Sequence, residues 1–466
     1  MTRHLAWTLA ITAAAIFMVT LDNLVVTTAL PVLRHDLGAS LADLEWTVNA
    51  YTLTFAVFLL TGAALGDRFG RRRILATGVG IFTAASAGAA LAPSVDVLIA
   101  ARAIQGFGAA LVAPLTLTIL SHAFPAERRG AALGLWGAVG GIAISAGPLV
   151  GGAVIEGLSW QWIFWLNVPI GLAVVPLAFR RLEESHGGDR TLDLAGLALA
   201  SAGLVALTWA IINGNADGWT SPGILGAFAA AAALLGAFLV WESHTAEPML
   251  PLRLFRDRSF AAANGAALLM SFGLFGSIFL LSQFFQSVQG LSPLQAGLRL
   301  LPWTLAPLFV APLAGALSDR IGGRPLMITG LAMQSTGLAW QAAVTQPDAA
   351  YSSLVGAFAM TGIGMALFFA PVANVVLSAV APAEAGKASG TNAAIREIGG
   401  VLGVAILAAV FSHAGGDITG GQAYTDGLRP AVYVGALVVA VGALAATLIP
   451  RRERPAREPA PALATA

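Results

Sequence analysis

The amino-acid sequence predicts an all-α polytopic membrane protein with fourteen transmembrane helices, arranged as two six-helix bundles and two extra central helices. Three observations indicate this class: an apolar composition, a sequence duplication, and a one-sided distribution of basic residues. The chain has 466 residues, of which 57% are hydrophobic and 11% are charged. A soluble domain carries about a quarter charged residues, so no soluble core would bury this composition.

Fourteen apolar runs are long enough to cross a membrane, which requires about 20 residues in a helix. The first run follows Arg3 and His4. It is longer than the apolar core of a signal peptide, so we interpret it as the first span. The predicted spans cover residues 7–30, 46–66, 74–93, 97–118, 130–155, 160–180, 193–213, 221–242, 259–284, 294–317, 325–345, 350–376, 388–412 and 429–449.

Two polar segments, residues 183–193 and 242–259, enclose the seventh and eighth spans. The chain is therefore predicted to form an N-terminal six-helix bundle over 1–182 and a linker with two additional transmembrane helices over 183–258. A C-terminal six-helix bundle follows over 259–450. The charged, Pro-rich segment 451–466 is expected to be a disordered cytoplasmic tail.

The end of the second span carries a dense group of charges. It reads Gly62-Ala-Ala-Leu-Gly66-Asp67-Arg68-Phe-Gly70-Arg71-Arg72-Arg73. Because arginine is very costly in hydrocarbon, the helix is predicted to leave the membrane here and a cytoplasmic loop to begin. Gly62 and Gly66 lie one helical turn apart and would allow a neighbouring backbone to approach closely.

Parts of the chain are duplicated. Residues 315–324 repeat the segment at the end of the second span as Gly-Ala-Leu-Ser-Asp-Arg-Ile-Gly-Gly-Arg. Ala113-Pro114, followed by Pro-Ala-Glu at 125–127, recurs at 370–371 and 382–384 with a closely similar offset. Two independent matches favour a true duplication over chance similarity between Ala-rich helices. Parallel halves of this kind form transporters whose binding site lies between the halves.

Basic residues indicate the orientation in the membrane. Of the 25 basic residues, Arg34 and Arg429 fall in loops on one side, and Arg102, Arg299 and Arg396 fall within spans. The others fall on the side of the N-terminus. The positive-inside rule therefore predicts a multi-pass protein of the cell inner (plasma) membrane with both termini cytoplasmic.

Two charged residues lie inside spans of the first half. Asp22 in the first span costs about 2.5–3.5 kcal/mol on insertion scales. A low dielectric disfavours its charged form, which suits a group that binds and releases a proton or attracts a cationic substrate. The alternative is an acid at the outer mouth, hydrated or paired with Asn23. Arg102 in the fourth span stays protonated, so it would act electrostatically on a carboxylate. The alternative is a snorkelling residue at the boundary.

Glycine is concentrated in the fifth span. The segment contains Gly134, Gly137, Gly140, Gly141, Gly147, Pro148, Gly151 and Gly152. This density favours close helix packing with a bend at Pro148, where a gate between the halves would flex. Packing without any gating role is the alternative.

The second half contains further candidates. Arg396 and Glu397 stand within the thirteenth span, and sequence neighbours on a helix need different partners. Glu397 is a second candidate proton or substrate group, with a structural ion pair to another span as the alternative. Arg299 lies close enough to the outer end of the tenth span to snorkel.

Several functional classes have no support in the sequence. There is no cysteine, which excludes disulfides and thiolate metal sites. The six histidines, at loops or span ends, have no metal-ligand spacing. No phosphate-binding loop of the ATP-hydrolysing type is present. We expect no enzyme activity, no cofactor, no metal and no nucleic-acid partner.

These motifs together resemble those of the major facilitator superfamily. Gly62–Arg73 resembles its signature between spans 2 and 3, and Arg102–Ala110 is similar to its span-4 motif, linked in the family to proton transfer. Gly147–Gly152 is similar to its antiporter motif. Leu21–Pro31 and Trp160–Pro169 resemble the fourteen-span drug:proton antiporter family. The resemblance covers the chain up to residue 450.

The resemblance implies alternating access between two bundles, with proton entry driving the export of a drug or toxic metabolite. By position, Asp22 would be the acid of span 1 and Arg102 the proton-relay arginine. Asp67 would help to lock one conformation, with Arg68, Arg71 and Arg72 nearby. Residues 23–27 depart from the pattern common in relatives, and the tenth span lacks an acid found in some exporters of cations. Export of dicationic compounds is therefore not expected.

The leading hypothesis is a proton-coupled exporter of amphipathic drugs or antibiotics that acts as a monomer in the lipid bilayer. Its small-molecule site would be apolar and aromatic, with Phe284, Phe285, Phe368 and Phe369 as candidates that core packing explains equally well. A dedicated exporter of one secondary metabolite, conferring self-resistance, is the close alternative. A non-transporting membrane sensor is a third hypothesis, and a membrane-embedded enzyme is weaker still.

Overall fold

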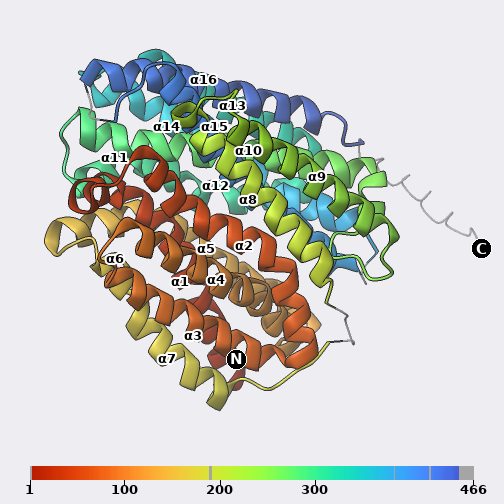
Figure 1. The fold of residues 1–466 in the computed structure, drawn as a ribbon. Helices are drawn as coiled ribbons and strands as arrows, with labels where there is room; N and C mark the ends of the chain where they lie inside the picture. Colours follow the sequence, from red (N-terminus) through yellow and green to blue (C-terminus); the bar gives the residue numbers. More distant parts are fainter. Residues whose placement is uncertain (1–2, 188–191, 382–383, 419–420, 451–466) are drawn as a thin grey trace, which may run out of the picture.

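The computed structural model describes residues 3–187, 192–381, 384–418 and 421–450, and all regular elements of these residues are helical (Figure 1). The first half contains α1 (Arg3–Leu37), α2 (Leu41–Phe69), α3 (Arg71–Ala90), α4 (Val95–Ala123), α5 (Ala126–Gly157), α6 (Trp162–Trp165) and α7 (Asn167–Arg181). A hairpin of α8 (Leu194–Asp217) and α9 (Pro222–His244) follows. The second half contains η1 (Leu252–Arg256), α10 (Arg258–Gln283), the π-helical η2 (Phe284–Val288), α11 (Pro293–Thr304), α12 (Ala306–Ile321), α13 (Gly323–Val344), α14 (Tyr351–Ser378), α15 (Ala385–His413) and α16 (Gly421–Ala446). The predicted tail over 451–466 lies outside the described residues.

Thirteen helical segments among the described residues are long and apolar enough to cross a membrane. Within these, α6 and α7 together form one span, and α11 and α12 form another. The remaining predicted span corresponds to α13, which has 22 residues but a more polar composition. Its Gln334 and Gln341 are fully buried, and Gln341 donates a 2.7 Å hydrogen bond to Thr361 Oγ1 in α14. With α13, the fourteen predicted spans are present.

At the tenth and the last span, the predicted boundaries differ from the observed ones for local reasons. The tenth span is interrupted at Leu305, between α11 and α12. Pro307 follows and has no N–H to continue the helical hydrogen bonds. The last span begins at Gly421, well before the predicted residue 429. Its first turns are polar, and Gln422 and Asp426 satisfy each other across one turn at 2.8 Å.

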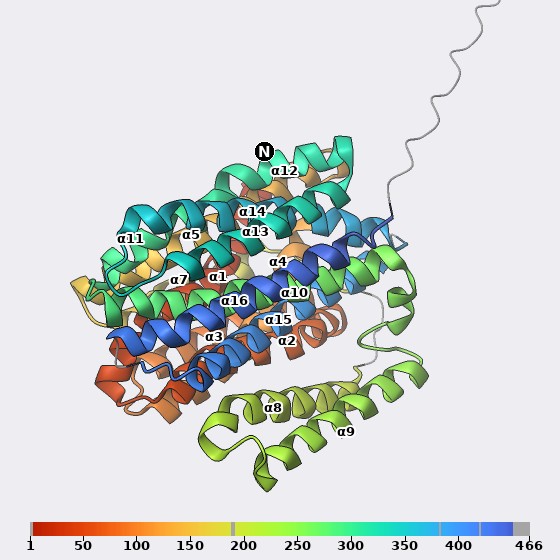
Figure 2. The same ribbon diagram turned by 90° about the horizontal axis from the view of Figure 1, so that it is seen from above.

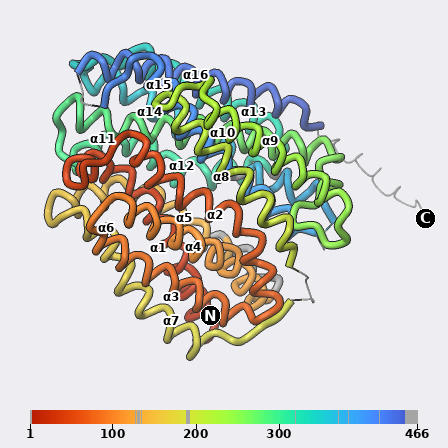
Figure 3. Tube along the Cα trace, in the orientation of Figure 1, coloured from red at the N-terminus to blue at the C-terminus, as the bar shows by residue number. Residues whose placement is uncertain are grey.

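The two halves repeat the same packing scheme. In the first half α1 packs on α5, α2 and α3 pack on α4, and α3 packs on α7. In the second half α10 packs on α15, α12 and α13 pack on α14, and α13 packs on α16. The Cα trace in Figure 3 shows the first half (red to yellow) and the second half (teal to blue) in separate regions. The duplication visible in the sequence thus recurs in three dimensions.

The halves meet mainly where α2 packs on α15 and α5 packs on α11 and α12, with smaller contacts of α1 with α10 and α11. The α8–α9 hairpin lies at one edge of the bundle, where α8 contacts both α2 and α15 (Figure 2). We call the end where α1 finishes and α2 begins the α1–α2 end, and the opposite end the α2–α3 end.

Hydrogen bonds between the halves cluster toward one end. Ser282 Oγ donates to Thr27 O at 3.1 Å, and Gln286 Nε2 donates to Thr28 O at 2.9 Å. Arg34 donates to the Ile418 carbonyl. At mid-depth, Ser145 Oγ of α5 donates to Thr304 O of α11 at 2.6 Å. The two halves are therefore hydrogen-bonded to each other at mid-depth and toward the α1–α2 end.

Candidate functional site

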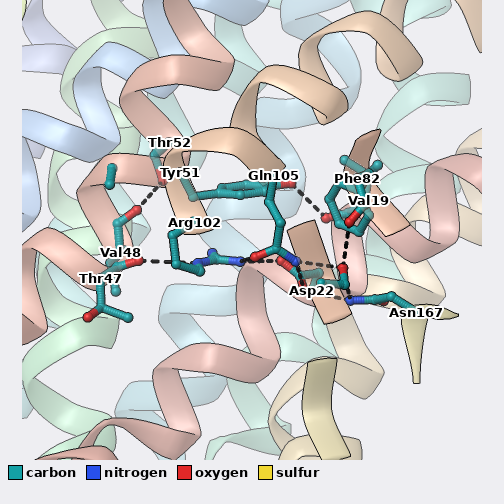
Figure 4. A network of polar contacts seen from close by, with 12 residues as sticks. Val19, Asp22, Thr47, Val48, Tyr51, Thr52, Phe82, Arg102, Gln105 and Asn167 are labelled. Atoms are coloured by element: carbon teal, nitrogen blue, oxygen red, sulfur yellow. Dashed lines mark hydrogen bonds and ion pairs between the residues drawn. The ribbon is translucent and has the colours of Figure 1, made fainter. Parts of the chain in front are cut away.

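A buried ion pair joins α1 and α4. Asp22 is 2% exposed and Arg102 is fully buried, and Arg102 Nη1 donates to Asp22 Oδ2 (Figure 4). Asp22 is therefore neither hydrated at an outer mouth nor paired with Asn23, and Arg102 does not snorkel. The two in-span charges that the sequence singles out in the first half lie together.

The second carboxylate oxygen of Asp22 is also fully engaged. Asn167 Nδ2 in α7 donates to Asp22 Oδ1 at 2.7 Å, and Gln105 Nε2 in α4 donates to the same oxygen at 3.2 Å. Gln105 Nε2 also lies 2.8 Å from Ser86 Oγ of α3. These amides therefore provide hydrogen-bond partners for the carboxylate oxygen that Arg102 does not contact.

Arg102 is held on its other side by α2. Its Nε donates to Thr47 O at 3.2 Å, and its guanidinium carbon lies 4.2 Å from the centre of the Tyr51 ring. The Tyr51 hydroxyl in turn donates to Val19 O of α1 at 3.1 Å. A cation over an aromatic face is stabilised by the ring quadrupole. Helices α1, α2, α3, α4 and α7 thus converge on one buried charge pair.

Glycines in α4 make this convergence possible. A Cβ on Gly106 would lie 2.2 Å from Tyr51 O, and a Cβ on Gly108 would lie 2.8 Å from Phe82 N. These two glycines therefore permit α2 and α3 to approach α4 on two sides, which brings Tyr51 to Arg102 and Ser86 to Gln105.

Protonation would change the balance of charge in this buried arrangement. A buried ion pair is stable only while both partners stay charged and paired. Protonation of Asp22 would leave the Arg102 charge uncompensated, because arginine does not release its proton. The helices would then have to rearrange so that Arg102 finds another partner or water.

The network includes residues to which the sequence analysis gave no role. Gln105, Asn167, Ser86 and Tyr51 are uncharged, and such residues are frequent in membrane helices. For Gln105 a signal existed, since it lies one helical turn from Arg102. For Asn167 and Ser86 only the three-dimensional arrangement reveals the contact.

The predicted conformational motif lies at the turn between α2 and α3. Asp67 Oδ1 accepts hydrogen bonds from Arg71 Nε at 2.9 Å and Nη2 at 2.7 Å, and both side chains are nearly buried. A Cβ on Gly62 would lie 2.3 Å from Ala110 O of α4, as expected for close backbone approach, and a Cβ on Gly66 would meet the Leu115 side chain.

Glu184, which the sequence analysis did not single out, organises this turn. Its Oε1 accepts a 2.9 Å hydrogen bond from Arg72 N, and its Oε2 lies 3.5 Å from Arg72 Nε. The neighbouring backbone adds two contacts, from Arg71 N to Ser185 O and from Gly187 N to Asp67 O, both at 2.9 Å. Gly70, at φ 102°, brings the turn against the Glu184 carboxylate. Arg68 lies over the Phe69 ring instead.

We expect Glu184→Gln to loosen the α2–α3 turn. A hydrogen bond to a charged group contributes about 1.5–3 kcal/mol, so amide hydrogen exchange of residues 70–73 should accelerate roughly tenfold or more. Glu183→Gln is the matched control, because the Glu183 side chain is 86% exposed and lies 3.6 Å from His4. Equal exchange rates in the two variants would show that Glu184 does not hold the turn.

The predicted antiporter motif lies in α5 between two helices. A Cβ on Gly147 would lie 2.6 Å from Leu24 Cβ, and one on Gly151 would lie 3.0 Å from Val25 O, so this face packs on α1. A Cβ on Gly152 would lie 2.4 Å from Pro293 O of α11 in the other half. The carbonyl of Pro148 closely faces Gly297, also in α11. The motif therefore packs on α1 within its own half and on α11 of the other half.

Arg396 and Glu397 have separate environments in α15. The Arg396 guanidinium lies 5.0 Å from the centre of the Phe369 ring. Glu397 is 7% exposed, and its Oε2 has no hydrogen-bond partner among the described residues. Neither residue joins the hydrogen bonds around Asp22.

The other candidates are placed by packing. Phe284, Phe285 and Phe368 are fully buried in the hydrophobic core, while Phe369 is partly buried beneath Arg396. Arg299 donates to Gln289 at 2.6 Å. Among the described residues there is no group of His, Asp and Glu side chains suited to a metal ion.

Comparison with known proteins agrees with these features. A sequence profile of the Major Facilitator Superfamily matches residues 12–303 and 263–465. The chain is 34% identical over 414 residues to the tetracenomycin C resistance and export protein of Streptomyces glaucescens, covering 88% of this chain and 77% of the relative. It is 37% identical over 414 residues to the multidrug resistance protein Stp of Mycobacterium tuberculosis, with the same coverage. It is 39% identical over 409 residues to the cephamycin export protein CmcT of Amycolatopsis lactamdurans, covering 86% of this chain and 84% of the relative.

Solved structures of low sequence identity share the fold. A bacterial homologue of the human lysosomal transporter Spinster, in an inward-facing and unoccupied conformation, superimposes with a TM-score of 0.67 at 16% identity, covering 96% of this chain and 98% of that one. A POT family transporter in complex with a thioalcohol-conjugated peptide gives a TM-score of 0.69 at 13% identity, covering 93% and 95%.

Proposed function

The chain belongs to the Major Facilitator Superfamily, and from this premise we propose that it is a proton-coupled antiporter that exports amphipathic drugs, antibiotics or toxic metabolites. It is a multi-pass membrane protein, and the relatives named above are exporters or resistance proteins. Drug efflux is the function that these relationships support. Proton coupling is supported by the buried pair of Asp22 and Arg102.

The ion pair supports proton coupling because a proton and Arg102 compete for Asp22. While Asp22 is ionised, it holds Arg102 and the five helices around it in one arrangement. A proton on Asp22 removes this attraction, so proton binding and the paired arrangement exclude each other. An antiporter requires such a group, because the proton and the substrate must favour different conformations. Glu397 is a second candidate for the same role.

We propose that the α2–α3 end faces the cytoplasm and that both termini lie on that side. Basic residues at Arg68, Arg71, Arg72 and Arg73 support this orientation. The bundles over 1–182 and 259–450 would be the units that rock about the site between them. The structure would then be closed toward the outside, and the close contacts of α5 with α1 and α11 would be at the moving interface.

The breadth of substrates separates two versions of this function. Some relatives are named for one antibiotic, such as tetracenomycin C, and others are named multidrug transporters. A resistance panel in a pump-deficient host distinguishes them, because a dedicated exporter protects against one chemical series only.

Inverted membrane vesicles test the function directly. An acidic vesicle interior should drive uptake of a fluorescent amphipathic cation such as ethidium, since the interior corresponds to the cell exterior. A protonophore should abolish the accumulation and an ATP-depleting treatment should leave it unchanged. Accumulation that persists after the proton gradient is collapsed would refute proton coupling. If the protein still protected cells against the drug in that case, drug efflux would remain its function.

A further inference from the structure

A second buried carboxyl group lies on α2, away from the ion pair. Glu45 is 3% exposed, and its Oε2 has no hydrogen-bond partner in the part of the chain that the structure describes. Asn49 lies one turn further along the same face and is fully buried, with neither side-chain polar atom bonded. Three buried polar atoms without a partner thus lie about one helical turn apart on this face. Native structures rarely leave such groups unsatisfied without a functional reason.

This face of α2 borders the contact between the halves at the α1–α2 end. Ala42 and Trp46, on either side of Glu45, pack with Ile211 of α8 and with Ala405 and Ala409 of α15. We call this contact the α2–α15 seam. Tyr51, whose ring lies beneath Arg102, is about 120° around the helix from Glu45. Glu45 lies about 60° around the helix from Ala42 and about 100° from Trp46, so it borders the seam and does not face the ion-pair site.

The charged groups on the helices packed against α2 do not neutralise Glu45. On α1, Asp22 is bonded to Arg102 of α4, Arg34 donates to the Ile418 carbonyl, and His35 pairs with Asp36. The arginines that begin α3 lie at the opposite end of the molecule. Three further groups are exposed to solvent: Asp96 of α4, Asp217 of α8 and His413 of α15. Arg396 and Glu397 of α15 lie more than two turns further from this end than the seam residue Ala405, and Arg396 lies over the Phe369 ring. On α2 itself, Asp43 caps the helix start at Ser40.

An unpaired charge in such a place is unfavourable. A buried ionised carboxylate without a partner carries a large desolvation cost, whereas a protonated carboxyl group is a neutral polar group. Separation of α2 from α15 would admit water to Glu45 and remove this cost. The protonation state of Glu45 and the state of the seam are therefore linked.

We propose that Glu45 is a gating acid of the transport cycle, which takes up a proton from the outer solution when the α2–α15 seam closes and releases it when the seam opens. This inference rests on the proposed orientation and export function. Opening of the α2–α15 seam, which would be the outer gate, then depends on the pH outside the cell, because acid outside favours the closed seam. That is the direction an exporter needs, since closure follows delivery of the substrate to an acidic exterior.

The absence of cysteine in the sequence provides the assay. Ala405→Cys places a single thiol within the closed seam, and a membrane-impermeant maleimide added to intact cells labels it when the seam opens. The labelling rate is measured from pH 6 to pH 9 with Glu45 and with Glu45→Gln, whose amide mimics the protonated acid. Dividing the two rates cancels the pH dependence of the thiol itself.

We expect the labelling rate with Glu45, divided by the rate with Glu45→Gln, to rise at least about tenfold from pH 6 to pH 9. Linkage to one proton changes an equilibrium up to about tenfold per pH unit. Glu45→Asp should keep the pH dependence, because an acid remains. Asp36→Asn, which alters an exposed acid at the same end, should behave as the unmodified protein. Glu45→Met, of similar volume, replaces Glu45→Gln if that variant does not accumulate.

A ratio that stays constant with pH, or a Glu45→Asp variant that behaves as Glu45→Gln, would overturn the proposal. The assay needs neither substrate nor a proton gradient. A pH-dependent ratio without gradient-driven transport would therefore retain the gating acid and refute the antiporter. A constant ratio together with gradient-driven transport would refute the gating acid and retain the antiporter.

Discussion

Asp22→Asn is expected to abolish gradient-driven uptake into inverted vesicles, reducing it to the level of vesicles without the protein. Asparagine keeps the shape of Asp22 but cannot exchange a proton, and it leaves Arg102 without its counter-charge. The measurement is ethidium accumulation under an acid-inside gradient, normalised to the amount of folded protein in the vesicles.

A second readout separates coupling from a structural role. Exchange of substrate across the membrane without a gradient needs no proton, so Asp22→Asn should retain it if the residue couples protons. Asp36→Asn is the matched control on the same helix, since Asp36 is partly exposed and pairs with His35. Full gradient-driven uptake by Asp22→Asn would move the coupling role to Glu397.

Among the single substitutions proposed, Arg102→Met should lower the stability of the folded protein most. Breaking a buried ion pair by removing one partner costs about 3–5 kcal/mol, because the other charge remains buried. In this site the stranded carboxylate of Asp22 would keep hydrogen bonds from Asn167 and Gln105 only. Thermal inactivation of the detergent-purified protein, followed by size-exclusion chromatography, measures the effect.

The double variant Asp22→Asn with Arg102→Met provides the decisive comparison. It leaves no unpaired charge, so it should be more stable than Arg102→Met alone, and the cycle should show a coupling of the two sites. Arg299→Met controls for loss of an arginine that is only partly buried. Strictly additive effects of the two single changes would show that the ion pair is not a thermodynamic unit.

The number of spans was predictable because length and hydropathy determine which helices cross a bilayer. The boundaries were less predictable, because charged residues at helix ends lower local hydropathy although they remain helical. Glu45 illustrates this: the predicted second span starts at residue 46, whereas α2 starts at Leu41. An acid that the sequence places at the edge of a span is in fact buried inside a helix.

The site was predictable only where charge made residues conspicuous. Asp22 and Arg102 stand out because ionised groups are rare in spans. Asn167, which donates to Asp22, and Ser86, which accepts from Gln105, come from helices that the sequence does not place next to α1. The role of Glu184 depends on a loop that folds back over the α2–α3 turn, and no periodicity in the sequence encodes that return.

The polarity of α13 has a consequence for how the chain is made. A segment with two buried glutamines partitions poorly into lipid as an isolated helix, because each amide needs a partner that hydrocarbon does not supply. Those partners are Thr361 of α14, which emerges from the ribosome later, and Met270 of α10, which emerges earlier. Integration of α13 into the bilayer is therefore a cooperative event that requires its neighbours, and the order of synthesis places α14 as the helix that completes it.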